Sequence, residues 1–151
     1  CDTVSASMER IVADVEVLDP AITVHVDIAC DCMNLRDGRV GTTMLAVGEA
    51  VRNASLHAAA SQVHVTCERS SGRMLVTVRD DGDGLPKDVR PGFGIRHSII
   101  GRMHELGGSA RFEPACPRGT RVRLELPLGS PSPVARSPLE SQSPARERVV
   151  R

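Results

Sequence analysis

Residues 75–86 read LVTVRDDGDGLP, a strand-like run that ends in a cluster of aspartates and glycines. Its first half alternates apolar and polar residues, which predicts a β-strand with one buried face. The strand then runs into three aspartates interleaved with two glycines, from Asp80 to Gly84. An ionised carboxylate only accepts hydrogen bonds, so this strand end is typical either of a charged turn or of a pocket that receives a donor.

The sequence on both sides of this strand predicts a mixed sheet with helices. Residues 62–70 (QVHVTCERS) show the same alternation, and Ser71-Gly72 predicts a hairpin turn between the two strands. Further strands are expected at 21–28, 110–114 and 120–128, and helices at 8–17, 40–60 and 95–106. The longest helix carries an apolar stripe that consists of Val47, Val51, Ala54 and Ala58. These elements indicate an α+β fold, a two-layer α/β sandwich with one mixed sheet and its helices on a single face.

Length and composition limit the classes of protein to which the chain can belong. The 151 residues suffice for one domain, expected at 1–128, followed by a Pro-, Ser- and Arg-rich tail at 129–151 that we expect to be disordered. The formal net charge of +0 gives no general attraction to nucleic acid or to an anionic membrane. No apolar run approaches the roughly 20 residues that cross a bilayer. We therefore expect no nucleic-acid partner, no membrane contact by this part of the protein and a cytoplasmic location.

The five cysteines agree with that location. Their number is odd and their spacing is irregular, which suits a reducing compartment better than a disulfide framework. Cys30 and Cys32 have the spacing of half a metal site, but no second pair stands at zinc-like spacing. A structural metal is therefore not expected.

Three polar residues recur at steps of four on the longest helix: Glu49, Asn53 and His57. Each step rotates the side chain by about 40°, so the three groups form one stripe beside the apolar one. A carboxylate and an amide oxygen at this spacing can hold a hard cation such as Mg²⁺ and position an attacking group next to it. The alternative is an ordinary solvated helix face, which the stripe taken alone favours.

The aspartate cluster has a functional interpretation of its own. Asp80, at the strand end, can accept a hydrogen bond from an exocyclic amine such as that of adenine. Gly82 and Gly84 have no Cβ, so the backbone can turn with positive φ and lie against a flat ring. A calcium loop is less well supported, because the glutamate that an EF-hand requires is missing. A charged turn remains the alternative to both.

A second glycine pair, Gly92 and Gly94, immediately precedes a predicted helix. Free backbone N–H groups and the positive end of the helix dipole would then point into a glycine loop, which is an arrangement that binds phosphate. Glycines also simply begin helices, so this pair alone does not distinguish the two interpretations.

The order of these segments resembles a known family. EAVRNASLHA (49–58), VRDDGDG (78–84), GFGI (92–95) and RGTRVRLELPL (118–128) resemble the N, G1 and G2 boxes and the closing strand of the GHKL ATPase superfamily. The resemblance is greatest to the ATP-binding catalytic domain of bacterial sensor histidine kinases that are paired with NarL-type response regulators. It covers about residues 8–128 and implies the Bergerat-type ATP-binding fold.

The resemblance implies a role for each residue of the helix stripe. Asn53 would coordinate a Mg²⁺ ion that bridges the ATP phosphates, and Glu49 would be the polarising or base-like carboxylate. His57 would support the phosphate side. The family usually has Lys or Arg before this histidine, where this chain has Leu56. The residues that could replace that cation are Arg52, Lys87, Arg90 and Arg96.

It also implies how the nucleotide would be held. Asp80 would accept from the adenine amine, and Thr120 would reach the adenine pocket through its hydroxyl. The glycines would line the ring and flank the phosphates: Gly82 and Gly84 at the ring, Gly92 and Gly94 at the phosphates. Asp81 and Asp83 would lie at the rim of the pocket.

For the protein as a whole, the resemblance implies transfer of the γ-phosphoryl group of ATP to a histidine. No pair of long helices that could form a dimerisation domain is present, so the phosphoacceptor histidine and its dimerisation domain are expected elsewhere, with a response regulator as the further partner. The chain alone should bind ATP and turn over little. Two alternatives are an anti-sigma-factor serine kinase and an interaction module of the same fold without nucleotide.

Overall fold

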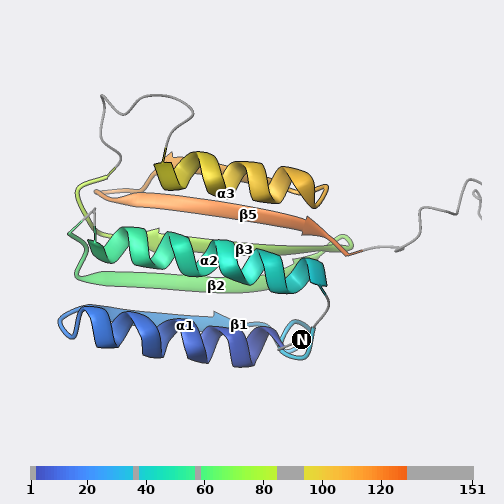
Figure 1. The fold of residues 1–151 in the computed structure, drawn as a ribbon, viewed down its shortest axis with the longest axis horizontal. Helices are drawn as coiled ribbons and strands as arrows, with labels where there is room; N and C mark the ends of the chain where they lie inside the picture. The colour runs from blue at the N-terminus through green and yellow to red at the C-terminus, as the bar shows by residue number, and fades with distance from the viewer. Residues whose placement is uncertain (1–2, 36–37, 57–58, 85–93, 129–151) are drawn as a thin grey trace, which may run out of the picture.

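The computed structural model describes residues 3–35, 38–56, 59–84 and 94–128, which form a five-stranded sheet and three helices (Figure 1). The strands, in chain order, are β1 (Thr23–Ile28), β2 (Gln62–Ser70), β3 (Arg73–Asp80), β4 (Ser109–Pro114) and β5 (Thr120–Pro127). Their order in the sheet is β1-β2-β3-β5-β4. β1 and β2 are parallel, whereas the other neighbours are antiparallel. The sheet is therefore mixed, as the sequence predicts.

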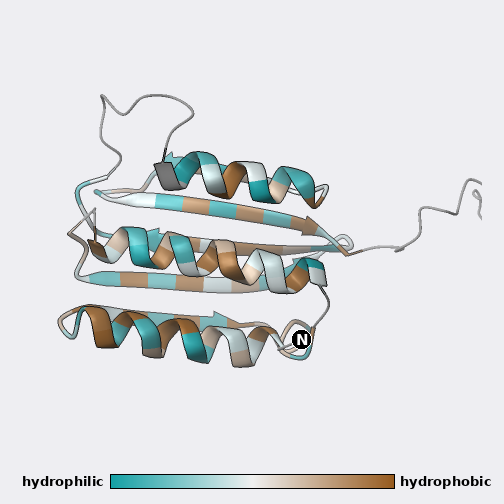
Figure 2. Ribbon diagram, viewed as in Figure 1, coloured by the Kyte–Doolittle hydropathy of each residue, from teal (hydrophilic) through white to brown (hydrophobic). Residues whose placement is uncertain are grey.

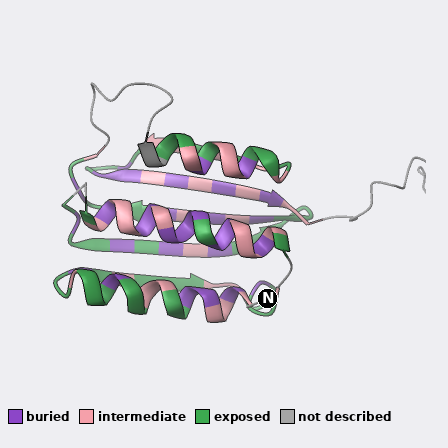
Figure 3. Ribbon diagram, in the orientation of Figure 1, coloured by how far each residue is buried: buried purple, intermediate pink, exposed green. Residues whose placement is uncertain are grey.

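All three helices cover one face of this sheet (Figure 1). They are α1 (Val4–Leu18), α2 (Gly38–Leu56) and α3 (Gly94–Glu105). Along the strands apolar and polar residues alternate, and the buried positions coincide with the apolar ones (Figures 2 and 3). In β3, for example, Met74, Val76 and Val78 are buried against the helices. The predicted two-layer α/β sandwich with helices on a single face is confirmed.

The central helix α2 is buried because its apolar stripe faces the sheet. Val47, Val51 and Ala54 are at most 1% exposed, as predicted. Ala58 lies outside the described residues, and α2 ends at Leu56 rather than at residue 60. Beyond it Ala59 has a φ of 54°, which is not compatible with a continuing right-handed helix.

The first helix begins earlier than its apolar pattern predicts. α1 starts at Val4 instead of residue 8, because the Oγ1 atom of Thr3 accepts a hydrogen bond of 3.1 Å from the backbone N–H of Ala6 and caps the helix. Val4 is fully buried, and its N–H donates to the carbonyl oxygen of Leu35. The expected hairpin between β2 and β3 is present, with positive φ at both Ser71 and Gly72.

Several sequence predictions concern residues that the structure does not describe. His57, Gly92, Lys87 and Arg90 are among them, and so is the predicted tail at 129–151. Within the described residues no helix is long and apolar enough to span a membrane. The same part of the chain contains no group of three or more His, Cys, Asp or Glu side chains that could bind a metal ion.

Candidate functional site

Four of the predicted motifs converge at one end of the sheet. The C-terminal end of α2, the end of β3, the beginning of α3 and the beginning of β5 all lie on the same side of the molecule (Figure 1). Asn53, Asp80, Gly94 and Thr120 belong to these four ends. The topology thus brings together residues that are far apart in the sequence.

Asp80 is the last residue of β3 and continues its inward-facing row, so its carboxylate lies on the helix side of the sheet. The residue is only 7% exposed. Its Oδ1 atom accepts hydrogen bonds from the N–H of Gly82 at 2.8 Å and from the N–H of Thr120 at 3.3 Å. Burial raises the pKa of Asp80, and these two backbone hydrogen bonds counteract that shift. Its Oδ2 atom has no hydrogen-bond partner among the described residues, so one oxygen of a buried carboxylate is left for a ligand.

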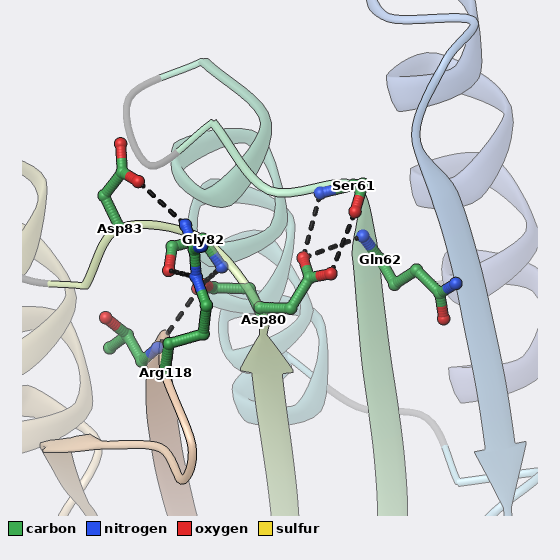
Figure 4. A network of polar contacts seen from close by, with 8 residues as sticks. Ser61, Gln62, Asp80, Gly82, Asp83 and Arg118 are labelled. Carbon is green, nitrogen blue, oxygen red and sulfur yellow. Dashed lines mark hydrogen bonds and ion pairs between the residues drawn. The ribbon is translucent and has the colours of Figure 1, made fainter.

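A second set of contacts joins the loop after β3 to the turn between β4 and β5 (Figure 4). Arg118 donates through Nε to the carbonyl oxygen of Gly82 at 3.0 Å and through Nη2 to Asp83 at 2.9 Å. The N–H of Ala115 donates to the carbonyl oxygen of Gly119 and closes the turn. The loop that carries Gly82 is therefore held against β5. Sequence reasoning did not identify Arg118, because nothing local indicates that its side chain reaches a loop more than thirty residues away.

Gly119 is required by a close approach of two backbones. Its φ is +101°, and a Cβ placed there would lie 1.9 Å from the carbonyl oxygen of Asp80. Gly84 also has a positive φ, of +85°, and an added Cβ would lie 3.6 Å from the carbonyl oxygen of Gly119. The glycines of the two motifs thus face each other, and the predicted turn with positive φ after Asp80 is present at Gly84 but not at Gly82.

Asp81, the next residue, has hydrogen-bond partners different from those of Asp80. Its carboxylate accepts hydrogen bonds from the N–H groups of Ser61 and Gln62 and from the Ser61 hydroxyl, at 2.9 to 3.0 Å. These hydrogen bonds lower the pKa of Asp81, and the one from the N–H of Gln62 has the largest effect. The carboxylate of Asp81 therefore anchors the beginning of β2, and its place at the rim of the adenine pocket stays a prediction.

Glu49, the first residue of the polar stripe on α2, faces α3. Glu49 forms an ion pair with Arg102 of α3, and their side chains are 22% and 32% exposed. Asn53, one turn further along α2, is half-buried and makes no hydrogen bond to the described residues. Its amide is therefore available to a ligand. Arg102 was not identified from the sequence, because a basic residue in the last turn of a helix is common for electrostatic reasons alone.

Two of the candidates for the cation missing at Leu56, Arg52 and Arg96, are among the described residues, and which residue replaces that cation stays a prediction. Arg52 lines a groove together with Ile11 of α1, and its Nη1 atom is 3.4 Å from the position of a Cβ on Gly48 of α2. The guanidinium of Arg96 lies over the ring of Phe112 at 5.9 Å from its centroid. Leu56 itself is 58% exposed at the end of α2.

Comparisons with known proteins agree with this geometry. Residues 40–130 match the family described as histidine kinase-, DNA gyrase B-, and HSP90-like ATPases. The signal transduction histidine-protein kinase/phosphatase UhpB of Salmonella typhimurium is 29% identical over 126 residues, which are 83% of this chain and 25% of that protein. The sensor histidine kinase PdtaS of Mycobacterium tuberculosis is 31% identical over 150 residues, 85% of this chain and 30% of that protein. The chain thus spans between a quarter and a third of these relatives.

Solved structures show the same likeness. A blue-light activated histidine kinase of Erythrobacter litoralis superimposes with a TM-score of 0.69 at 29% identity, over 83% of this chain and 42% of that one. The ATP-binding domain of PrrB from Mycobacterium tuberculosis superimposes with a TM-score of 0.68 at 23% identity, over 85% of this chain and 96% of that one. The second match extends over nearly the whole of a separate ATP-binding domain, which supports the fold.

Proposed function

Because the chain belongs to the family of histidine kinase-, DNA gyrase B-, and HSP90-like ATPases, we propose that it is the ATP-binding catalytic part of a sensor histidine kinase. Membership of this family implies ATP binding. Both curated relatives named above are histidine kinases, so the resemblance to sensor histidine kinases that the sequence motifs predicted is confirmed. We also propose the phosphoryl transfer to histidine, the Mg²⁺ ion and the partner domains that are described below.

The observation that carries the proposal is the buried carboxylate of Asp80. A carboxylate that is 7% exposed and uses one oxygen for two backbone N–H groups needs a donor at the other. The exocyclic amine of adenine is such a donor, and Gly84, which has no Cβ, would lie against the flat ring. The hydroxyl of Thr120, whose N–H already bonds to Asp80, would complete the recognition of adenine directly or through water. Gly82 would line the ring.

The triphosphate would extend from adenine toward the space between α2 and α3. Gly94 is the first residue of α3, so free N–H groups and the positive helix dipole would favour phosphate there, with Gly92 on the preceding segment. Asn53 would contribute its amide oxygen to Mg²⁺, which binds proteins through one or two ligands and takes the rest from phosphate and water. When bound, the ion would neutralise charge on the transferred phosphoryl group. His57 would support the phosphate side.

Glu49 would act next to the γ-phosphate as a polarising or base-like carboxylate. The acceptor would be a histidine on a dimerisation domain outside the described residues, and a response regulator would receive the phosphoryl group afterwards. Phosphoryl transfer depends mainly on position and charge neutralisation, so a domain separated from its acceptor should bind ATP and turn it over slowly. We place this activity in the cytoplasm, where ATP is present.

Isothermal titration calorimetry with ATP, with and without Mg²⁺, tests the proposal. Asp80→Asn preserves the shape of the side chain and presents an amide whose N–H₂ would face the adenine amine if its oxygen keeps the backbone hydrogen bonds. We expect saturable binding by the wild type, tighter with Mg²⁺, and a loss of at least tenfold in Asp80→Asn. Asp27→Asn, an exposed aspartate in β1, is the matched control and should bind like the wild type.

Three outcomes are distinguishable. A folded wild-type protein that binds no nucleotide would favour the interaction module over the kinase. Binding that Asp80→Asn leaves unchanged would refute the assignment of the adenine site. Transfer of ³²P from ATP to a serine of an added protein, rather than to a histidine, would favour the anti-sigma-factor kinase.

A further inference from the structure

The ion pair between Glu49 and Arg102 connects α2 and α3 beside the space where the triphosphate is proposed to lie. Both side chains are partly buried, at 22% and 32% exposure, so water screens their interaction less than it would at the surface. We propose that Arg102 is a positioning residue that compensates the charge of Glu49 and thereby allows the γ-phosphate to approach it. This inference rests on the proposed function, and it concerns a residue that lies outside the four sequence motifs.

The electrostatic reason follows from the spacing on α2. Glu49 and Asn53 are one helical turn apart, about 6 Å along the axis. If Asn53 holds the metal and phosphates, an uncompensated carboxylate at Glu49 would lie within several ångströms of a polyanion. At such a distance and at the effective dielectric constant of a partly buried site, one unit of repulsion is enough to weaken binding at least tenfold. Arg102 removes that repulsion and also restricts the orientation of the carboxylate.

No other arginine described on these two helices is placed to do this. Arg52 is directed toward Gly48 and α1, and Arg96 lies over Phe112 of β4. Of the described arginines on α2 and α3, Arg102 alone forms an ion pair between the two helices. The position belongs to the last turn of α3, whose antiparallel packing on α2 brings it to Glu49 (Figure 1).

The effect should depend on the γ-phosphate, which reaches Glu49, more than on adenine or the α-phosphate. Arg102→Ala is therefore expected to lower the affinity for Mg-ATP by about tenfold and the affinity for Mg-ADP by much less. Removing the charge of Glu49 as well should remove the repulsion, so the double variant Arg102→Ala/Glu49→Gln should bind Mg-ATP more tightly than Arg102→Ala alone. A residue that only stabilised the fold would not show this recovery.

The experiment measures dissociation constants for Mg-ATP and Mg-ADP by calorimetry and thermal midpoints without nucleotide. The variants are Arg102→Ala, Arg102→Lys, Glu49→Gln and the double variant. Arg73→Ala removes a more exposed ion pair, with Glu125 of β5, that involves neither α2 nor α3, and it should leave both affinities unchanged. Arg102→Lys keeps a cation and should retain most of the affinity for Mg-ATP, which keeps the test decisive if Arg102→Ala does not fold.

A larger loss of affinity for Mg-ATP than for Mg-ADP in Arg102→Ala, with recovery of the affinity for Mg-ATP in the double variant, would support the inference. Equal losses for ATP and ADP, no recovery in the double variant, or a loss in Arg102→Lys as large as in Arg102→Ala would overturn it while the ATP site stands. A wild-type protein that binds neither nucleotide would instead refute the proposed function, and this inference with it.

Discussion

Replacing Gly119 with alanine tests whether the close approach of β3 and β5 holds the candidate site together. The new Cβ would lie 1.9 Å from the carbonyl oxygen and 2.7 Å from the carbonyl carbon of Asp80, and both of these are backbone atoms. They cannot turn away as a flexible side chain would. The backbone of the turn must therefore move away from the end of β3.

Two costs add at this position. A residue other than glycine at a φ of +101° is strained by roughly 1–3 kcal/mol. Relief of the overlap with Asp80 costs about 1–3 kcal/mol more, as for other overpacked sites. We expect Gly119→Ala to lower the free energy of unfolding by about 2–6 kcal/mol, a large part of the ~5–15 kcal/mol typical of a domain. For a domain of this size the melting temperature should fall by roughly 10–20 °C.

Gly72→Ala provides the matched control. Gly72 also has a positive φ, of +75°, but no atom lies within 4 Å of an added Cβ. It should therefore show only the conformational cost, about 1 kcal/mol. Urea unfolding followed by circular dichroism measures both variants, and calorimetry measures their binding of Mg-ATP. If Gly119→Ala is no less stable than Gly72→Ala and binds ATP equally well, the reasoning from the close approach is refuted.

Two further variants test the aspartates at the end of β3, and a third tests the packing near the C-terminal end of β5, away from the site. Asp80→Asn should be at least as stable as the wild type at pH 7, because burial raises the pKa of Asp80 and so disfavours its ionised form. As the pH falls through that raised pKa, the melting temperature of the wild type should rise toward that of Asp80→Asn. A marked destabilisation of Asp80→Asn at pH 7 would contradict this. Asp81→Ala should melt a few degrees below the wild type at pH 7, because hydrogen bonds to the ionised carboxylate lower the pKa of Asp81 and stabilise the fold. This stabilisation is present above the unfolded pKa of about 4 and is lost as the pH falls through the lower folded pKa. The melting temperatures of the two proteins should therefore converge in acid. Gly108→Ala would place a Cβ 2.1 Å from the carbonyl oxygen of Glu125 and should lower the free energy of unfolding by about 1–3 kcal/mol in urea titrations. Unchanged stability would refute this expectation.

Much of the fold and part of the site follow from local patterns in the chain. The alternation in residues 75–80 determines that Asp80 lies on the buried face of its strand, because side chains point to opposite faces at successive positions. The stripe on α2 likewise determines which residues face the sheet, and it leaves Glu49 and Asn53 beside the buried face. These predictions succeeded because each depends on periodicity within a single element.

The contacts that make the site depend on the tertiary structure instead. Asp80 meets the N–H of Thr120 across 40 residues only because β5 is inserted between β3 and β4, and this strand order also makes Gly119 indispensable. Glu49 meets Arg102 across 53 residues because α2 and α3 pack side by side on the sheet. Periodicity determines which face of an element a side chain occupies. Which other element lies against that face is decided by the packing of the whole domain, where a helix or strand has several possible neighbours and burial selects one of them.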